Sequence, residues 1–502
     1  MKGGWLLSSL SSLILAGIFA LAFRFPGALG GWLEPVLALV FPLLLLDGLF
    51  KGRHAAWIWI SLFAGLLLLY LWVPQTLASK GGLPFAVALL GMVLLSLWEA
   101  TGLWLVAVGS RWLGRRSGPL GAALGAALLL LAWESWGFHV YPWTWGAAFG
   151  SLPWTARSAA FLGASGLSAL AWGAGAWTAA ALAEGASARR TLAGLAFALG
   201  FLVLGGGAWY LLPREAAKAL DVVMIQPNFP PGQRWLGMEA DMWRRSDAVL
   251  KTRGLPWAGR STLLLWPESS VLGRDDRQPD PRLAAEAATR GIAWLFGTEG
   301  GLFNLVRGEA PGRPSFIFAK TEPMAFGERT PGPAGFRRWL DGRMGFTSQE
   351  AGELADGCAF TVPAAAGEVR VHPLICSEAL MPERSRRGLA LGRAHLLSNH
   401  TNDGWFDQSI ATDLHAAQIR LRATELGVPL LRATLSGKSG VFREDGRFEL
   451  WGEPLSEGAY ALDLQWRPIR TPARSAWLRP LLAGGLALAL LLLGWKALPW
   501  KP

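Results

Sequence analysis

Long apolar segments dominate the first 212 residues of the chain, and one more lies near its C-terminus. Each is about 20 residues long, the length that an α-helix needs to cross a bilayer. The first segment has no convincing small-residue cleavage site and further segments follow it, so we do not expect a cleaved signal peptide. The predicted spans are Trp5–Phe23, Trp32–Phe50, Ala55–Val73, Phe85–Gly109, Gly118–Gly137, Ser158–Ala183, Thr191–Leu212 and Trp477–Leu493.

Basic residues in the short loops predict how these spans are oriented. With the N-terminus inside, the inner loops carry ten basic residues: Lys2, Lys51, Arg53, Arg111, Arg115, Arg116, Arg189, Arg190, Lys496 and Lys501. The outer loops carry only Arg24, Lys80 and Arg157. Because cytoplasmic loops are enriched in Lys and Arg, both termini are predicted to be cytoplasmic and residues 213–475 to lie outside.

The pattern changes at about Asp221 to short apolar runs separated by turns and helical segments. Near-continuous apolar runs are typical of strands that are buried on both faces. Asp413–Leu426 has helical spacing and ends at Gly427, and Asp445-Gly446 predicts a hairpin turn. The expected strands are Val222–Phe229, Ser261–Glu268, Gly291–Thr298, Pro314–Lys320, Val369–Cys376, Ala394–Thr401 and Val428–Thr434.

The chain is therefore predicted to have three parts. Residues 1–212 form a transmembrane helical domain of seven spans, residues 213–475 an α/β domain, and residues 476–502 a last transmembrane helix and tail. A hydrophobic content of 52% fits this organisation and excludes an ordinary soluble enzyme. The formal charge of +11 comes largely from the loops, and without an arginine-rich motif it does not indicate nucleic-acid binding.

Three polar residues stand at or just beyond the ends of predicted strands: Glu268, Lys320 and Cys376. In α/β folds such positions often carry catalytic groups. Glu268 could remove the proton of the thiol, Lys320 could stabilise an oxyanion, and Cys376 could carry an acyl group. Taken singly, each has a structural explanation: a surface carboxylate, a solvated lysine, or a core cysteine. A Cys358–Cys376 disulfide is a further alternative, since an outside domain permits one.

Other features leave their interpretation open. Gly121 and Gly125 would allow close helix packing. Glu99 and Glu134 lie in apolar segments, where a charge is a functional candidate, but both are near the end of a span and could reach interfacial water. The aromatic loop 137–154 fits either an interfacial belt or a surface that handles lipid chains. The six histidines have no metal-binding spacing, and no metal or cofactor is expected.

Four ordered motifs carry a family resemblance: LLLWPESS, FAKTEPMAFGE, HPLICSEAL and SNHTNDGWF. They resemble the nitrilase, or carbon–nitrogen hydrolase, superfamily, whose triad is Glu-Lys-Cys. Together with seven preceding spans and one following span, they make the whole chain similar to the apolipoprotein N-acyltransferases. This resemblance implies a periplasmic αββα-sandwich domain on a multi-pass base in the bacterial inner membrane.

The resemblance also implies a reaction and its residues. These enzymes transfer an acyl chain from a phospholipid to the α-amino group of a lipoprotein's diacylglyceryl-cysteine, through a cysteine thioester. By motif, Glu268 would be the base, Lys320 the oxyanion partner and Cys376 the nucleophile. Partners would be the two lipid substrates and the membrane, with a monomer expected. Supporting carboxylates would be Glu328 and Glu378, and possible substrate-binding residues Trp235, Asn304, Trp405 and Phe406.

Some positions depart from the family pattern, and other functions are open. The departures are Phe303, Glu322, Ala325, Ser377 and Leu435. A membrane-anchored amidase or nitrilase that uses water as second substrate is the main alternative, although one anchor would suffice for it. A catalytically silent scaffold would not require the Glu268-Lys320-Cys376 set. A transporter would be expected to show an inverted repeat.

Overall fold

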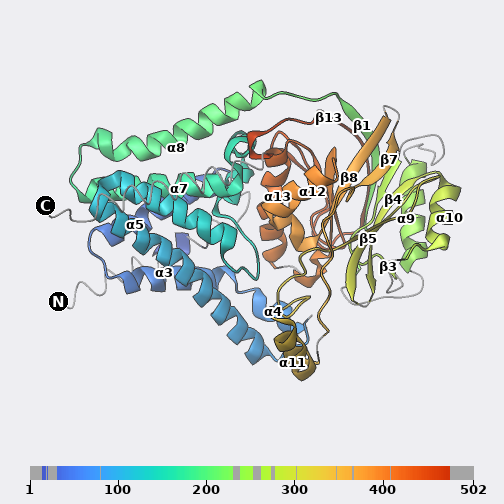
Figure 1. Ribbon diagram of the computed structural model, residues 1–502, viewed down its shortest axis with the longest axis horizontal. Helices are drawn as coiled ribbons and strands as arrows, with labels where there is room; N and C mark the ends of the chain where they lie inside the picture. Colours follow the sequence, from blue (N-terminus) through green and yellow to red (C-terminus); the bar gives the residue numbers. More distant parts are fainter. Residues whose placement is uncertain are drawn as a thin grey trace. The chain divides into compact units, whose positions relative to one another are not determined.

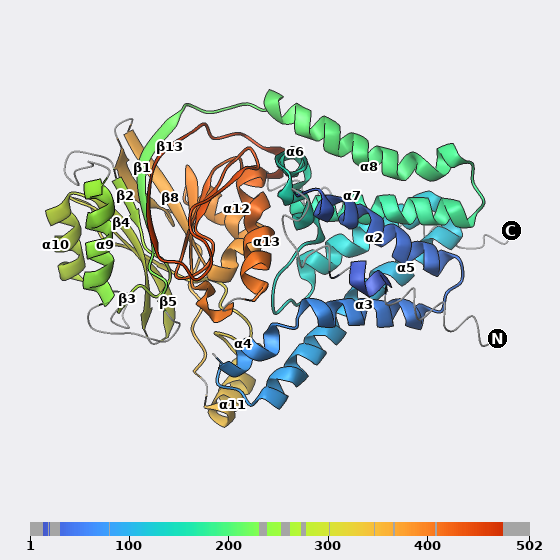
Figure 2. The same ribbon diagram turned by 180° about the vertical axis from the view of Figure 1, so that it is seen from behind.

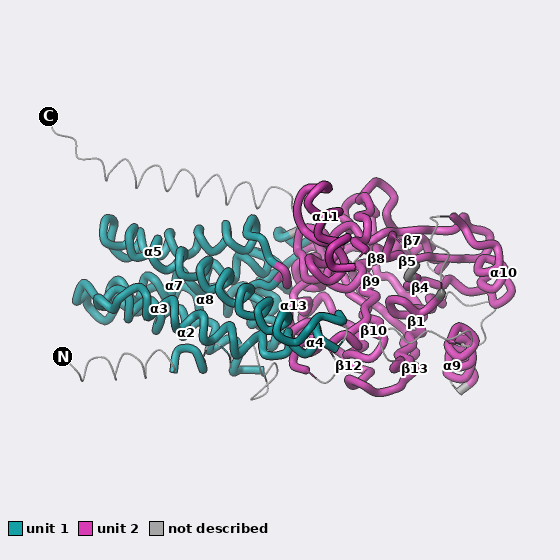
Figure 3. The backbone as a smooth tube through the Cα atoms, turned by 90° about the horizontal axis from the view of Figure 1, so that it is seen from below, with its two compact units in different colours: residues 1–139, 143–212, 471–502 teal, residues 140–142, 213–470 magenta. Residues whose placement is uncertain are grey.

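The computed structural model describes residues 14–18, 20, 31–79, 81–229, 238–252, 262–272, 278–300, 302–345, 347–364, 367–406 and 409–474. The chain divides into two compact units (Figure 3). Unit 1 contains Met1–His139, Trp143–Leu212 and Thr471–Pro502, and unit 2 contains Val140–Pro142 and Pro213–Arg470. Most of the predicted span Trp5–Phe23 and all of Trp477–Leu493 lie outside the described residues.

Unit 1 is helical (Figures 1 and 2). Four of its described helices are long and apolar enough to cross a membrane, or five if α3 and α4, which meet at 44°, form one bent span. A multi-pass membrane domain is therefore confirmed, while the count of eight spans stays a prediction. The helices are α2 (Leu33–Phe50), α3 (Ala55–Leu69), α4 (Val73–Ser79), α5 (Phe85–Trp136), α6 (Pro153–Arg157), α7 (Ala159–Ala183) and α8 (Ala188–Ala208), with short 3-10 turns η2 (Trp145–Ser151) and η3 (Trp209–Leu211).

Helix α5 folds back on itself. Its 52 residues would extend about 78 Å as one rod, far more than the ~30 Å core of a bilayer. The backbone leaves the helical region at Ser117 and at Gly118, where φ is 65°. Across this break, the Ser110 hydroxyl of the first arm donates to the Ala122 carbonyl of the second arm at 2.8 Å. A Cβ atom on Gly121 would lie 2.7 Å from the Leu113 carbonyl oxygen, so glycine permits the close packing of the two arms.

The end of the first arm differs from the prediction. The span was expected to end at Gly109, with Arg111, Arg115 and Arg116 in a loop, but all three residues are helical. Gly114 is the only glycine between Gly109 and Gly118, and no proline lies there. A single glycine costs a helix only about 1 kcal/mol, so the helical hydrogen bonds continue through the polar residues.

The two intramembrane glutamates also have partners within unit 1. Glu99 is 0% exposed, and its Oε1 lies 2.9 Å from Nδ1 of His139. Helix packing encloses this pair, so Glu99 does not reach interfacial water. The interpretation of Glu99 as a carboxylate in contact with interfacial water is therefore wrong. Oε1 of the partly exposed Glu134 accepts the Trp145 backbone N–H at 2.8 Å.

Unit 2 contains two sheets. The seven-stranded sheet has the order β13-β1-β2-β4-β5-β6, with β3 paired to β4, and the six-stranded sheet has the order β12-β11-β10-β9-β8-β7. The first consists of β1 (Lys218–Gln226), β2 (Thr262–Leu265), β3 (Val271–Leu272), β4 (Ala293–Gly300), β5 (Phe303–Glu309), β6 (Phe316–Ala319) and β13 (Gly458–Trp466). The second consists of β7 (Phe360–Ala364), β8 (Gly367–Ile375), β9 (Leu396–Thr401), β10 (Leu430–Thr434), β11 (Gly440–Phe442) and β12 (Phe448–Leu450).

The two sheets pack face to face between helices (Figure 1). Side chains from both, including Val222 of β1 and Val371 of β8, form the central core. Helices α9 (Met238–Thr252) and α10 (Pro281–Arg290) cover the outer face of the first sheet, where Met242 and Leu283 join a second core. Helices α12 (Pro382–Leu391) and α13 (Ala411–Leu426) lie beside the second sheet. The predicted α/β sandwich is confirmed.

Each of the seven predicted strands overlaps an observed one, and two local predictions are also confirmed. Helix α13 ends at Gly427, which has a φ of 66° and caps the helix. Strands β11 and β12 pair as a hairpin around Gly446. Strands β3, β5, β7 and β13 were not predicted. Strand β13 pairs along all of β1 although the two lie far apart in the chain, which a local pattern does not reveal.

Candidate active site

The ends of three strands bring the predicted catalytic residues together. Strands β2 and β4 are parallel, and β4 is antiparallel to β5, which is antiparallel to β6. The C-terminal ends of β2 and β6 therefore lie at the same edge of the first sheet. Glu268 follows β2 and Lys320 follows β6 directly. Cys376 follows β8 of the facing sheet.

Glu268 is held by two hydrogen bonds. Its Oε1 accepts from Nδ2 of Asn304 at 2.6 Å, and its Oε2 accepts from the Asn402 backbone N–H at 2.8 Å. The carboxylate is only 5% exposed. A Cβ atom at Gly297 of the neighbouring strand would lie 2.4 Å from the Glu268 Cα, so this turn requires glycine beside it. The predicted base thus has a fixed position and orientation.

Lys320 forms a buried ion pair with Glu328. Lys320 Nζ and Glu328 Oε2 are 2.6 Å apart, and the lysine side chain is 1% exposed. Asn304 Nδ2 also donates to Glu328 Oε1 at 3.0 Å, which links the predicted base to the ion pair. Burial opposes the charge of Lys320, but Glu328, Cys376 and Glu268 together hold its pKa well above its ordinary value. The ammonium group is therefore charged at neutral pH.

Cys376 lies in a strained turn. Its φ is 50°, a left-handed conformation that costs a side-chain-bearing residue roughly 1–2 kcal/mol. It begins the 3-10 turn η4 (Cys376–Leu380), and Glu378 supports this turn. Glu378 Oε2 accepts the Ile375 backbone N–H at 2.8 Å, and Oε1 accepts the backbone N–H and the hydroxyl of Thr321 at 2.7 Å each. The structure thus joins the turn of the candidate nucleophile to Thr321, the residue after Lys320.

The thiol of Cys376 is protonated in the resting site. Burial and the negative charges of Glu268 and Glu328 raise its pKa to about 12, although Lys320 and a hydrogen bond with Thr401 oppose the shift. A thiol with this pKa needs a base at the moment of attack, because only the thiolate is a strong nucleophile. The neighbouring carboxylate of Glu268 fits that role.

Cys358 and Cys376 are both free thiols, so the Cys358–Cys376 disulfide is excluded. Cys358 is buried in the core between the sheets, with Sγ 3.7 Å from the Gly388 carbonyl oxygen. It is a core cysteine rather than a partner of the candidate nucleophile.

The other predicted binding residues have different surroundings. Trp235 lies outside the described residues. Trp405 is 40% exposed and Phe406 is 7% exposed, and both belong to the turn η5 (Asp403–Phe406). The Phe406 ring packs edge-on against His415, so it lies in the interior rather than facing a substrate.

The positions that depart from the family pattern are accommodated by the fold. Phe303 begins strand β5, and Glu322 forms an ion pair with Arg384. Ala325 forms an isolated β-bridge with Arg329 in the loop that carries Glu328. Ser377 and Leu435 are both buried, at 3% and 4% exposure.

Two groups that hold the site were not predicted: the backbone N–H of Asn402, which binds Glu268, and the side chain of Asn399, which binds the Cys376 carbonyl at 3.1 Å. Both belong to the motif SNHTNDGWF, which was singled out only for its resemblance. The motif was therefore a usable signal, but nothing in it distinguishes a substrate contact from a support for other residues.

Comparisons with known proteins agree with this arrangement. Residues 319–453 match the family model described as carbon–nitrogen hydrolase. This segment contains Lys320, Glu328 and Cys376, whereas Glu268 precedes it.

Three similar proteins are each called apolipoprotein N-acyltransferase. The protein from Azotobacter vinelandii is 30% identical over 444 residues, which are 81% of this chain and 78% of the relative. Those from Allorhizobium ampelinum and Pseudomonas putida are each 29% identical over 433 residues, 79% of this chain, and 77% and 81% of the relatives respectively. The chain belongs to the apolipoprotein N-acyltransferase family.

Proposed function

We propose that this protein is an apolipoprotein N-acyltransferase with Glu268, Lys320 and Cys376 as its catalytic residues. It moves a fatty acyl chain from a membrane phospholipid to the α-amino group of a lipoprotein's N-terminal diacylglyceryl-cysteine. The observation that carries this proposal is the turn at Cys376, which holds a protonated thiol in a strained conformation among Glu268, Lys320 and Glu328.

The first half-reaction forms a thioester. Glu268 takes the proton of the Cys376 thiol as the sulfur attacks the ester carbonyl of the phospholipid. The charged Lys320, held by Glu328, stabilises the oxyanion that develops on that carbonyl. The C–O bond then breaks, and the proton on Glu268 passes to the leaving oxygen, which releases a lysophospholipid and leaves the acyl chain on Cys376.

The second half-reaction uses the same groups. The α-amino group of the lipoprotein attacks the thioester, Glu268 accepts a proton from the amine, and Lys320 stabilises the second oxyanion. The C–S bond breaks, the thiolate regains the proton, and an amide is formed. Two substrates that use one site in turn give ping-pong kinetics.

The surface next to the site supports a lipid substrate. Helix α11 (Ala334–Met344) follows Glu328 by a short loop and has no buried residue. Phe336 and Trp339 are 50% and 55% exposed, and their rings pack together 5.8 Å apart. Exposed aromatic side chains beside arginines are typical of surfaces that contact lipid.

The location of the site completes the proposal. The excess of basic residues in the predicted inner loops supports a periplasmic α/β domain and cytoplasmic termini in the bacterial inner membrane. We further propose that Glu378 holds the nucleophile turn and that Asn304 holds Glu268 and Glu328. A monomer contains every catalytic residue of this proposal.

Intact mass spectrometry of the purified protein with phospholipid vesicles tests the proposal. A hydroxylamine-labile increase equal to one fatty acyl chain is expected in the wild type and not in Cys376→Ala. A diacylated lipopeptide should then discharge it and become triacylated. If no adduct forms under any lipid composition, the acyltransferase mechanism is wrong. If only water discharges the adduct, the protein is a hydrolase of the same superfamily.

A further inference from the structure

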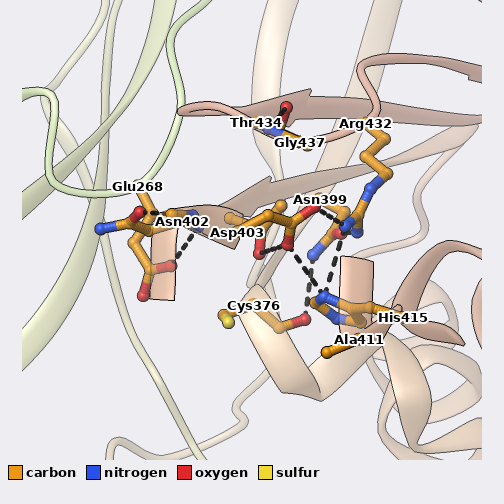
Figure 4. Close-up of polar contacts among 12 residues, drawn as sticks. Glu268, Cys376, Asn399, Asn402, Asp403, Ala411, His415, Arg432, Thr434 and Gly437 are labelled. Carbon is orange, nitrogen blue, oxygen red and sulfur yellow. Dashed lines mark hydrogen bonds and ion pairs between the residues drawn. The ribbon is translucent and has the colours of Figure 1, made fainter. Parts of the chain in front are cut away.

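A cluster of buried polar side chains lies next to the turn of Cys376, on strands β9 and β10, on the turn η5 and on α13 (Figure 4). The buried cluster consists of Asn399, Asp403, His415 and Arg432, and each of these residues is at most 1% exposed. The reaction proposed above uses none of them. Charged groups so completely removed from water need a compensating function or a complete set of partners.

Asn399 holds the backbone on both sides of the nucleophile. Its Nδ2 donates to the carbonyl oxygens of Leu374 at 3.2 Å and of Cys376 at 3.1 Å. Glu378 accepts the backbone N–H of Ile375, which lies between them. Side chains from two sources therefore bind three consecutive residues, 374–376. This arrangement can maintain a left-handed φ at Cys376 that the isolated backbone would not favour.

Arg432 determines the orientation of the Asn399 amide. Arg432 Nη1 donates to Oδ1 of Asn399 at 2.5 Å. Since the oxygen of the amide faces the guanidinium group, its NH₂ group must face the two carbonyls. If the amide were rotated by 180°, its oxygen would face two other oxygens and both contacts would be repulsive.

Asp403 completes the fixed geometry of Arg432. Arg432 Nη2 lies 2.6 Å from Oδ2 of Asp403, and both side chains are 0% exposed. Nδ1 of His415 lies 3.0 Å from Oδ1 of the same carboxylate. Burial opposes ionisation of Asp403, but Arg432 and His415 hold its pKa well below its ordinary range. A Cβ atom at Gly437 would lie 2.0 Å from Asp403 Oδ2, so this glycine leaves the space that the carboxylate occupies.

The same segment also holds the base. Asn402 is the residue before Asp403, and its backbone N–H donates to Oε2 of Glu268 at 2.8 Å. Figure 4 shows Glu268 beside Asn402 at one end of this segment, Cys376 below Asp403, and Arg432 on the side away from Glu268. Strand β9 and the turn after it thus bind the nucleophile through Asn399 and the base through Asn402.

We propose that Arg432 is a positioning residue: its two guanidinium nitrogens lock Asn399 and Asp403, and through them fix Cys376 relative to Glu268. The consequence for acyl transfer rests on the function proposed above, but the geometric part does not. Lysine at this position would keep the charge, yet its single ammonium group would not hold two partners in the fork geometry of arginine.

The experiment compares Arg432→Lys, Asn399→Ala and the double variant with the wild type. Single-turnover formation of the thioester should fall about 10–100-fold in each single variant, since a misplacement of about 1 Å can cost that much. The apparent affinity for phospholipid should change less than about threefold. The double variant should be no slower than the worse single variant, because the action of Arg432 on the turn of Cys376 passes through Asn399.

A second readout needs no lipid. The rate of iodoacetamide alkylation of Cys376 is measured against pH in the same variants, each in a Cys358→Ala background. Arg432→Lys and Asn399→Ala should shift this profile in the same direction and by a similar amount, with no further shift in the double variant. This readout tests the positioning role even if the wild type forms no acyl adduct and the proposed function fails.

Arg422→Lys is the matched control. Arg422 is also 0% exposed and pairs with Glu425 at 2.8 Å on α13, so it tests for a general effect of shortening a buried arginine. Its alkylation profile and acylation rate should stay within about threefold of the wild type. The inference is overturned if the Arg432→Lys profile matches the wild type, if Arg422→Lys has the same effect, or if the effects of Arg432→Lys and Asn399→Ala multiply.

Discussion

Cys358 precedes strand β7 and packs into the core between the sheets, whereas Cys376 follows strand β8 and begins the turn η4. Burial raises the pKa of both thiols. At Cys358 the remaining influences are local and small in number: its own backbone and Asp356. At Cys376 two carboxylates, an ammonium group and a hydroxyl all act on the thiol. Both thiols are therefore desolvated, and they differ in the charged groups that surround them.

The backbone differs in the same way. Cys376 has a φ of 50° and is bound on both sides by Asn399 and Glu378, whereas Cys358 is not among the described residues with positive φ. A core cysteine needs only space, while a nucleophile needs a defined direction of approach to its substrate. Strain that is maintained by specific hydrogen bonds therefore distinguishes the proposed nucleophile from the core cysteine better than the pKa of either thiol does.

The largest expected difference between the two regions is catalytic. Lys320→Met removes the ammonium group from the oxyanion and should lower the rate of thioester formation about 10²–10³-fold. Cys358→Ala should leave that rate within about threefold of the wild type, because its side chain contacts only the core. Single-turnover acylation followed by intact mass measures both. Comparable losses in the two variants would mean that Cys358 belongs to the active site.

An intermediate effect concerns the charge on the thiol. Glu268 raises the pKa of Cys376, so Glu268→Gln should lower that pKa and increase the thiolate fraction at pH 8. Alkylation by iodoacetamide should become roughly tenfold faster if the shift is about one unit, while thioester formation falls because the base is lost. In the wild type and in Glu268→Gln alike, the alkylation rate of Cys376 should rise with pH from 7 to 10.

Opposite signs in these two measurements are the diagnostic result. If alkylation and acylation both fall, Glu268 holds the turn of Cys376 in place rather than serving as its base. Cys358 supplies the internal comparison, since the same substitution should not change its alkylation rate. Mass mapping of the modified peptides separates the two thiols.

The sequence was informative where a candidate site residue coincides with the end of a local apolar pattern. Glu268, Lys320 and Cys376 each end a short apolar run, so their placement at strand ends followed from hydropathy alone. Asn399 and Arg432 lie inside strands, at positions that read equally well as outward-facing polar residues. Only the pairing of β9 with β10 brings them together, and that contact has no local signature.

In the helical unit, the sequence predicted the helices but not where each of them ends. Apolar length predicted its helices, but the end of the first arm of α5 was misplaced because charged residues continue the helix as well as leucine does. The prediction at Gly121 succeeded because small residues have a direct steric meaning at a packed interface. Sequence patterns thus indicate which faces pack more reliably than where a helix ends.

The smallest expected effect concerns thermal stability. Replacing alanine by glycine should change the unfolding midpoint in opposite directions at Cys376 and at Cys358. Cys376→Gly should have an unfolding midpoint about 2 °C higher than Cys376→Ala. Glycine adopts a positive φ without the cost of a Cβ atom, and this gain exceeds the entropic disadvantage of glycine. At Cys358 the same pair, Cys358→Ala and Cys358→Gly, should differ in the opposite direction by a similar amount, because there only the entropic term remains. Differential scanning fluorimetry of the four variants in one detergent measures both differences. If glycine lowers the midpoint at both positions, the turn at Cys376 is not strained, and its hydrogen bonds hold a conformation that the backbone would adopt without them.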